Sequence, residues 1–124
     1  MENPIISILM TAYNREIYIS EAIESVLEST FNEFELIIVD DCSQDKTFQI
    51  AESYSLMDKR IRVYRNSENL GDYNNRNRAA KYALGKYLKY LDADDKIYKY
   101  SLQIMFEAME KNESAALGIS HCKI

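Results

Sequence analysis

The chain has 124 residues and a mass of 14.5 kDa, which is enough for one compact domain and too little for two. Apolar residues make up 47% of the chain and charged residues 28%, with three glycines and one proline, which excludes a disordered or low-complexity chain. The 20 acidic residues outnumber the 15 basic ones, and the resulting net charge of -5 excludes a general nucleic-acid-binding protein, which presents a basic face. Binding of one phosphorylated small molecule is compatible with this charge.

The two cysteines, Cys42 and Cys122, are too few for a metal cluster or a disulfide framework, and we interpret them as reduced thiols. No apolar run approaches the roughly 20 residues of a membrane span. The first four residues also lack the basic start of a signal peptide. These features predict a soluble, cytoplasmic protein.

Short apolar runs alternate with segments of helical spacing along the chain. The runs predict strands over residues 5–10, 34–39, 61–64, 87–91 and 115–119. A helix between each pair of strands implies right-handed crossovers and a mainly parallel sheet. The predicted fold class is therefore α/β, with one domain over residues 1–124 and helices flanking the sheet.

The intervening segments carry helix signals of their own. Residues 16–29 have an apolar stripe typical of a helix, and Ser43 is a candidate cap for the second helix, which we expect to bury Met57. The third helix is expected to pack through Leu84 and to end at Gly85. A fourth helix follows the acidic run at residues 92–95.

Polar residues gather at the carboxyl ends of three predicted strands. Residues 11–15 follow the first strand, Asp40 and Asp41 the second, and residues 92–95 the fourth. Open parallel sheets bind ligands beyond these strand ends, where the strand order reverses. We therefore expect the three loops to meet in one crevice.

Asp92, Asp94 and Asp95 place three carboxylates within four residues. Like charges this close repel one another unless a cation neutralises them. Mg2+ or Mn2+, held by one or two carboxylates and by phosphate oxygens, would remove that repulsion. The alternative interpretation is an acidic turn whose aspartates cap the next helix and face water.

The other loops offer groups suited to a nucleotide. One of Asp40 and Asp41 is expected to cap the following helix, which leaves the other free to accept an N–H of a ligand. Tyr13 has a flat face for stacking on a base, and Arg15 could pair with phosphate, although ordinary packing and a solvated arginine are the alternatives. His121 has no nearby partner in the sequence, and no glycine-rich dinucleotide loop or P-loop is present.

Five segments, taken in order, resemble the nucleotide-sugar-binding half of family 2 glycosyltransferases, which have the GT-A fold. They are residues 7–15, 25–30, 34–43, 69–71 with 76–77, and 91–95. Each segment is a weak signal alone, but five in register are specific. The last one matches the metal-binding Asp-x-Asp element of the family.

The resemblance implies a role for each candidate residue. Thr11, Tyr13 and Arg15 would lie around the uracil or the diphosphate of a UDP-sugar, Asp41 would read the edge of the base, and Asp92 would hold the ribose side.

The resemblance also implies a divalent cation, Mn2+ or Mg2+, held by Asp94, with Asp95 as an alternative ligand. This cation would stabilise the diphosphate as a leaving group.

Transfer to an acceptor hydroxyl, which we expect to invert the sugar, also needs a carboxylate base. In the family this base and the acceptor-binding elements follow a fifth strand. We therefore expect the base beyond Ile124, name no catalytic residue here, and expect this chain to bind donor without efficient transfer. The acceptor is expected to be a saccharide or a lipid-linked molecule, used by the full-length protein in the cytoplasm or at the inner face of the membrane.

The sequence departs from the family at Cys42, where a small residue is usual, and at Met10 and Ala12, where proline is common. Two other functions are kept as alternatives. A haloacid-dehalogenase-like phosphatase also has an Asp-x-Asp after a strand, and a phospho-receiver regulatory module has an acidic pair after a strand.

Overall fold

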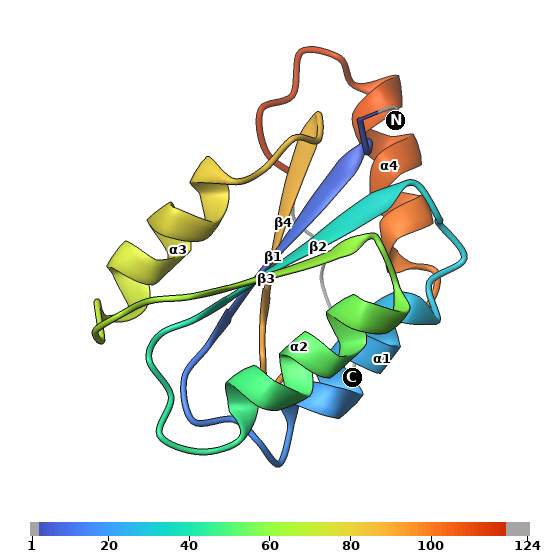
Figure 1. The fold of residues 1–124 in the computed structure, drawn as a ribbon. Helices are drawn as coiled ribbons and strands as arrows, with labels where there is room; N and C mark the ends of the chain where they lie inside the picture. The colour runs from blue at the N-terminus through green and yellow to red at the C-terminus, as the bar shows by residue number, and fades with distance from the viewer. Residues whose placement is uncertain (1–2, 119–124) are drawn as a thin grey trace.

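The computed structural model describes residues 3–118, which form a four-stranded parallel sheet with helices on both faces (Figure 1). The strands are β1 (Ile6–Ala12), β2 (Phe34–Asp40), β3 (Ile61–Arg65) and β4 (Tyr87–Asp92). The helices are α1 (Ile19–Leu27), α2 (Thr47–Met57), α3 (Asp72–Lys81) and α4 (Ser101–Lys111). The predicted α/β class is confirmed. Within residues 3–118, no helix is both long and apolar enough to cross a bilayer.

Strand β1 lies inside the sheet, whose order is β3-β2-β1-β4. Its apolar run is buried on both faces, with Ile8, Leu9 and Met10 each at most 1% exposed. The chain moves outward from β1 through β2 to β3 and then returns to place β4 on the other side of β1. Because right-handed crossovers in opposite directions leave the sheet on opposite faces, α3 lies on one face and α1, α2 and α4 on the other (Figure 1).

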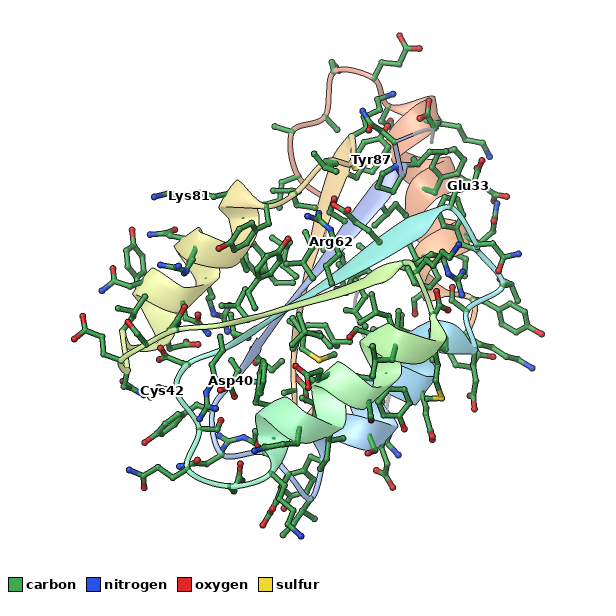
Figure 2. The ribbon with its side chains drawn as sticks, viewed as in Figure 1. Glu33, Asp40, Cys42, Arg62, Lys81 and Tyr87 are labelled. Carbon is green, nitrogen blue, oxygen red and sulfur yellow. The ribbon has the colours of Figure 1, made fainter. Side chains whose placement is uncertain are left out.

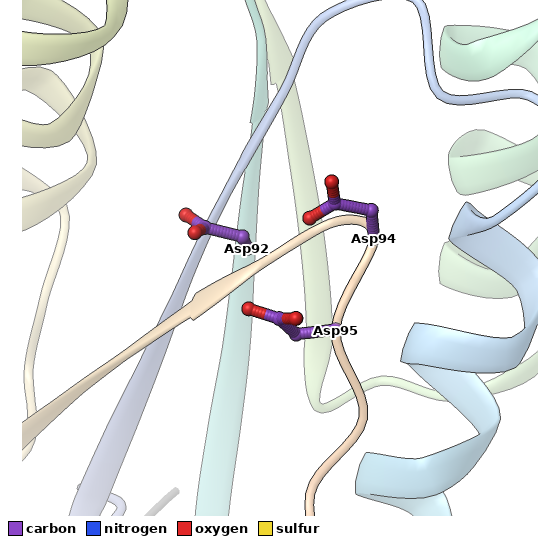
Figure 3. Close-up of side chains that lie close together, drawn as sticks. All are labelled: Asp92, Asp94 and Asp95. Atoms are coloured by element: carbon purple, nitrogen blue, oxygen red, sulfur yellow. The ribbon is translucent and has the colours of Figure 1, made fainter.

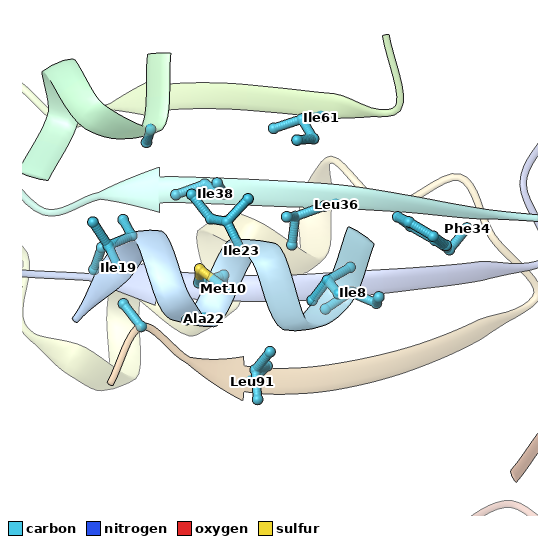
Figure 4. Close-up of a cluster of buried hydrophobic side chains, with 14 of the residues drawn as sticks. Ile8, Met10, Ile19, Ala22, Ile23, Phe34, Leu36, Ile38, Ile61 and Leu91 are labelled. Atoms are coloured by element: carbon cyan, nitrogen blue, oxygen red, sulfur yellow. The ribbon is translucent and has the colours of Figure 1, made fainter. Parts of the chain in front are cut away.

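Two apolar clusters fill the space between the sheet and its helices. The larger lies under α1, α2 and α4, and Figure 4 shows part of it around Met10, Ile23 and Ile38. The smaller lies under α3 and consists of Leu9, Ile37, Val39 and Ala79. Side chains alternate along a strand, so neighbouring residues of β1 and β2 supply opposite clusters. The sheet is thereby fixed from both sides, and its carboxyl edge carries the polar loops.

The predicted fifth strand is wrong over the part that the structure describes. Residues 115–118 form no strand, and Ile119, like His121 and Cys122, lies outside the described residues. The segment reads Ala-Ala-Leu-Gly, and alanine and glycine are poor strand formers. Its one large apolar side chain, Leu117, is 76% exposed and gains nothing from a sheet.

Met57 does not face the core as predicted, because it is 74% exposed. The buried face of α2 is centred on Thr47 and Ala51, which are both fully buried. Each residue advances the helix by about 100°, so Met57 falls at the margin of that face rather than at its centre.

The third helix ends at Lys81, before Gly85, so the prediction that Gly85 terminates it is also wrong. The chain leaves the helix at Tyr82, whose ring stacks on Tyr64 of β3 with centroids 3.8 Å apart. Leu84 then lies in a loop, 56% exposed, and its N–H donates to the Glu35 carboxylate (2.8 Å).

Gly85 is needed instead for a close approach to β1. A Cβ at this position would lie 2.7 Å from Ser7 Oγ and 2.8 Å from Ser7 N. The Gly85 N–H donates to the same Oγ (2.8 Å), and that hydroxyl donates to Glu35 (2.8 Å). The absence of a side chain therefore lets the loop enter β4 directly beside β1.

Candidate functional site

A cavity of about 360 Å³ opens where the carboxyl ends of β1, β2 and β4 meet. Figure 2 shows Asp40 and Cys42 at this end of β2, far from Glu33 at the other end. Among its lining residues are Thr11, Tyr13, Arg15, Asp41, Arg76, Asp92 and Asp94. All of these except Arg76 are predicted site residues, and the structure brings them together as the sequence predicts.

Parallel pairing explains this convergence. In the register of the sheet, Thr11 of β1 is the partner of Asp92 in β4, and Ala12 is the partner of Asp40 in β2. The strand order reverses between β1 and β4, so the loops that follow these strands diverge and leave a crevice between them.

Asp40 supports the loop that follows β1 rather than a helix. It is fully buried, and its carboxylate accepts hydrogen bonds from the backbone N–H (3.0 Å) and the hydroxyl of Ser43. Ser43 Oγ in turn accepts the N–H of Asn14 (2.9 Å), and Arg65 lies 3.6 Å from the Asp40 carboxylate. The predicted helix-capping role is therefore wrong for Asp40 and for Ser43.

Asp45, and not Asp40 or Ser43, binds the first residue of α2, because the helix begins only at Thr47. Its carboxylate accepts the Thr47 N–H (2.9 Å), the Thr47 hydroxyl and the Glu16 N–H (3.2 Å). Burial raises the pKa of Asp45, but the hydrogen bonds from Thr47 and Glu16 outweigh it, so the pKa lies below its ordinary value. Asp45 therefore stays ionised and ties the loop after β1 to α2.

Tyr13 and Arg15 stand at the rim of the cavity. Tyr13 is 42% exposed and lies in the cavity wall. The Arg15 guanidinium donates to the carbonyl oxygens of Tyr13 (3.0 Å) and Asn14 (3.2 Å), and Arg15 Nε lies 3.5 Å from an Asp94 oxygen. Asn14 has a φ of 50°, which curls the loop so that Arg15 points back over the strand ends.

Asp41 holds the loop between β3 and α3. Its carboxylate accepts hydrogen bonds from Asn66 Nδ2 (2.9 Å), the Leu70 N–H (2.7 Å) and the Gly71 N–H (3.0 Å). Gly71 has a φ of +86°, a conformation that glycine adopts at little cost. Two of the three bonds fall on Oδ1, so Oδ2 keeps one acceptor position. That position is available to a donor in the cavity.

The three aspartates after β4 converge as predicted (Figure 3). One carboxylate oxygen from each of Asp92, Asp94 and Asp95 lies within 4.8 Å of the others. Asp94 and Asp95 are exposed, and Asp92 is half-buried. A set of carboxylate oxygens alone is the chemistry that a hard divalent cation requires, so these residues fit Mg2+ or Mn2+.

Two guanidinium groups face this cluster. Besides the Arg15 contact with Asp94, an Arg76 Nη nitrogen donates to Asp92 (2.9 Å), and Arg76 Nε lies 3.3 Å from Asp72 one helical turn earlier. The Arg76 guanidinium carbon is also 5.7 Å from the centre of the Tyr90 ring. The carboxylate repulsion that the sequence indicates is thus partly neutralised by the protein itself.

Sequence reasoning gave no site role to Arg76 or to two buried amides, Asn66 and Asn75. Asn75 Nδ2 donates to the Val39 carbonyl (3.0 Å), and its Oδ1 accepts from Asn66 (2.8 Å). The i, i+4 spacing of Asp72 and Arg76 could have indicated that Arg76 points along α3 toward the strand ends. Nothing in the sequence distinguishes the buried side chains of Asn66 and Asn75 from those of solvent-exposed asparagines.

Comparison with known proteins places this geometry in a family. The model of glycosyl transferase family 2 matches residues 7–123. The chain is 39% identical over 112 residues to TuaG of Bacillus subtilis, a glycosyltransferase named for teichuronic acid biosynthesis. It is 38% identical over 113 residues to the Escherichia coli UDP-Glc:alpha-D-GlcNAc-diphosphoundecaprenol beta-1,3-glucosyltransferase WfgD. Each alignment covers 90% of this chain and 44% of the relative, so the chain spans less than half the length of these relatives.

Solved structures agree with this assignment. Staphylococcus aureus TarS (residues 1–349) in complex with UDP has a TM-score of 0.82 at 30% identity, covering 94% of this chain and 38% of TarS. A second structure of TarS contains UDP-GlcNAc. A mannosyltransferase of Pyrobaculum calidifontis in complex with GDP-Man and Mn2+ shares the fold, with a TM-score of 0.70 at 21% identity, covering 77% of this chain and 29% of that protein.

These matches decide against the phosphatase and receiver alternatives, since neither belongs to the matching family. The parallel sheet, the carboxylate turn after β4 and the match over residues 7–123 together show that the chain belongs to glycosyl transferase family 2 and has the GT-A fold.

Proposed function

We propose that this chain binds the nucleotide-sugar donor of a glycosyl transfer, a UDP-sugar, together with a divalent cation. One observation carries the proposal: a single cavity joins the carboxylates of Asp92 and Asp94, two guanidinium groups and an exposed tyrosine, and a carboxylate oxygen of Asp95 lies within 4.8 Å of those of Asp92 and Asp94. A nucleoside diphosphate needs this combination, because its base is flat and its diphosphate is anionic. The structures of TarS with UDP and with UDP-GlcNAc, at 30% identity, support uridine as the nucleoside.

The base is assigned to the side of the cavity formed by β1 and β2. Tyr13 would stack on one face of the uracil, a contact worth about 1–3 kcal/mol per base in proteins that bind single-stranded nucleic acid. The remaining acceptor position on Asp41 Oδ2 would receive the imide N–H of uracil, and Thr11 lies in the same wall of the cavity. The bonds from the 66–71 loop fix the Asp41 carboxylate before any ligand arrives, which lowers the cost of binding.

The ribose and diphosphate are assigned to the side formed by β4 and α3. Asp92 would accept a ribose hydroxyl, and Asp94 and Asp95 would hold the cation between them. When bound, this cation supplies Lewis-acid stabilisation of the departing diphosphate. Arg15 and Arg76 are the two guanidinium groups of the cavity wall, and they would hold the phosphate oxygens.

The full reaction would transfer the sugar, with inversion, to a hydroxyl of a saccharide or a lipid-linked acceptor. The name of the relative WfgD gives a diphosphoundecaprenol-linked GlcNAc as the acceptor of that enzyme. Inverting transfer needs a carboxylate base beside the acceptor hydroxyl. Asp41, Asp92 and Asp94 already have roles in this proposal, and Asp72, the fourth carboxylate among the lining residues, lies 3.3 Å from Arg76. The base is therefore assigned to a residue outside this cavity.

Titration calorimetry of UDP with the 124-residue chain tests the proposal. We expect binding in the presence of Mn2+ or Mg2+ that disappears when the metal is chelated. Asp94→Asn should weaken the metal-linked binding by tenfold or more, about 1.4 kcal/mol or above, because an ionised ligand of a hard cation is lost. Glu107→Gln removes the same charge from the exposed face of α4 and should leave binding unchanged.

Binding of equal strength with and without metal would contradict the role of the cation. If Asp95→Asn abolishes the metal effect and Asp94→Asn does not, the principal ligand is Asp95.

A further inference from the structure

The donor cavity already contains positive charge that competes for its carboxylates. Arg76 donates to Asp92 at 2.9 Å, and Arg15 lies 3.5 Å from Asp94. Within residues 3–118, Asp95 has no basic partner within 4.0 Å. The three carboxylates therefore face two guanidinium groups, so these five charges sum to -1, and Asp72, which also contacts Arg76, makes the surroundings more negative. A divalent cation entering this cluster meets two positive charges that already occupy two of its three ligands.

We propose that Arg76, assisted by Arg15, acts as an internal counter-ion that opposes cation binding in the nucleotide-free protein and moves to the diphosphate when nucleotide binds. This inference rests on the proposed function and adds a coupling to it. Cation and nucleotide then depend on each other for binding. Nucleotide draws the guanidinium groups away from the carboxylates that hold the cation, and the cation displaces them from these carboxylates and so frees them for the diphosphate. Linkage makes the dependence reciprocal: nucleotide tightens cation binding by the same factor by which cation tightens nucleotide binding.

The surroundings of Arg76 suit a side chain with two positions. Its Nε lies 3.3 Å from Asp72, and this contact keeps the guanidinium at the cavity when its pair with Asp92 breaks. Its side chain is 38% exposed, so it can rotate without unpacking the core. Arg76 lines the cavity. The diphosphate with which it would pair is proposed to bind in the same cavity.

Exposure also limits the size of the effect. Asp92 and Asp94 are 46% and 43% exposed, so solvent screens the pairs. Partly screened charges a few ångströms apart change a binding constant by about threefold to tenfold rather than by orders of magnitude. The coupling should therefore be measurable and should weaken at high ionic strength.

The test measures Mn2+ binding directly, from the electron paramagnetic resonance signal of the free ion, without nucleotide and then with UDP. Arg76→Gln removes the charge and keeps a hydrogen-bonding group. We expect it to bind Mn2+ about threefold to tenfold more tightly than wild type without UDP, and to show a smaller increase in affinity when UDP is added. Arg15→Gln should act in the same direction with a smaller effect, because its contact is longer.

The matched control is Arg78→Gln, which removes the same charge from the same helix at an exposed position outside the cavity wall. It should bind Mn2+ like wild type. Arg76→Lys keeps the charge and should restore most of the wild-type coupling. Thermal melts of all four variants ensure that only folded proteins are compared.

The outcomes separate this inference from the proposed function. Tight, UDP-dependent Mn2+ binding that Arg76→Gln and Arg15→Gln leave unchanged would overturn the counter-ion role and keep the donor site. If wild type binds no Mn2+ even with UDP, the cation role fails, and this inference fails with it.

Discussion

Asp40 and Asp41 are adjacent in the sequence, yet their carboxylates point to opposite sides of the strand end. Asp40 closes β2 and turns inward to Ser43, whereas Asp41 turns toward the cavity and the 66–71 loop. Both are at most 3% exposed. The role of each carboxylate depends on the loop that folds against it: Asp40 binds Ser43, three residues along the chain, whereas the partners of Asp41 lie in the distant 66–71 loop. The acidic pair therefore predicts a site, but the division of roles within it comes from the tertiary structure.

This division gives a prediction for Asp40. Asp40→Asn replaces one carboxylate oxygen by an NH2 group that cannot accept a hydrogen bond from Ser43, so we expect the free energy of unfolding to fall by about 1–3 kcal/mol. UDP affinity should change little at a temperature where the variant is folded, because Asp40 does not line the cavity. Urea unfolding checks the first expectation and calorimetry the second. A loss of stability below about 0.3 kcal/mol would show that the buried bonds to Ser43 contribute little.

The parts of the candidate site that come from one short stretch of sequence could be predicted. Three aspartates within four residues can only be close together, and the structure brings one oxygen from each within 4.8 Å. Arg76 was not assigned a role, because its contact with Asp92 depends on how α3 lies across the sheet, where it packs on β1 and β2. Ser43 was assigned a cap because the start of α2 was placed too early.

At the scale of elements, the four strands of the sheet were predicted to within two residues, the fifth predicted strand is absent over residues 115–118, and the ends of the helices were predicted less well. Apolar runs define buried strands strongly, since both faces of β1 and β2 must be apolar. The end of α3 is set instead by the stacking of Tyr82 on Tyr64, a contact between separate elements. Such contacts leave no pattern in the local sequence, which is why Gly85 was interpreted as a helix end.

Gly85 provides the test at this scale. Gly85→Ala would place a methyl group 2.8 Å from the backbone nitrogen of Ser7, so the entry of β4 would have to move away from β1. We expect a loss of about 1–3 kcal/mol in the free energy of unfolding, typical of overpacking in a rigid site. Thermal and urea unfolding measure this loss.

Gly71→Ala provides the comparison for Gly85→Ala. Nothing lies within 4 Å of a Cβ at position 71, so an alanine there would be strained only by the φ of +86° and not by a close contact. If Gly85→Ala is as stable as wild type, the loop is more adaptable than its contacts indicate.

For the whole molecule, fold class and family were predictable because they depend on the order of strands, helices and loops rather than on any single contact. Once the strand order is given, the right-handed crossover rule fixes which face of the sheet each connecting helix covers. What the sequence did not predict is the density of hydrogen bonds between loops, in which Asp41 receives three bonds from residues about 25 to 30 positions away.

A whole-molecule prediction concerns the response of the sheet to ligand. Ligands bound at the junction of β1 and β4 stabilise only conformations in which both strands are paired. We expect UDP with Mn2+ to slow amide hydrogen exchange most strongly in β4 and in the 66–71 loop, and little in the middle of β2, which is covered on both faces. Mass spectrometry of exchanged peptides measures this, with UDP and chelator as the control. Uniform slowing over all four strands would instead indicate global stabilisation without a local effect.

The placement of β4 beside β1 also has a consequence for synthesis on the ribosome. Thr11 emerges before Asp92, and the two become neighbours only after three crossovers, through α1, α2 and α3, are complete. Pairings so distant in sequence form slowly, because a long stretch of chain must be closed first. A nascent chain therefore exposes the apolar flank of β1 until β4 arrives, and the proposed nucleotide site is complete only at that moment.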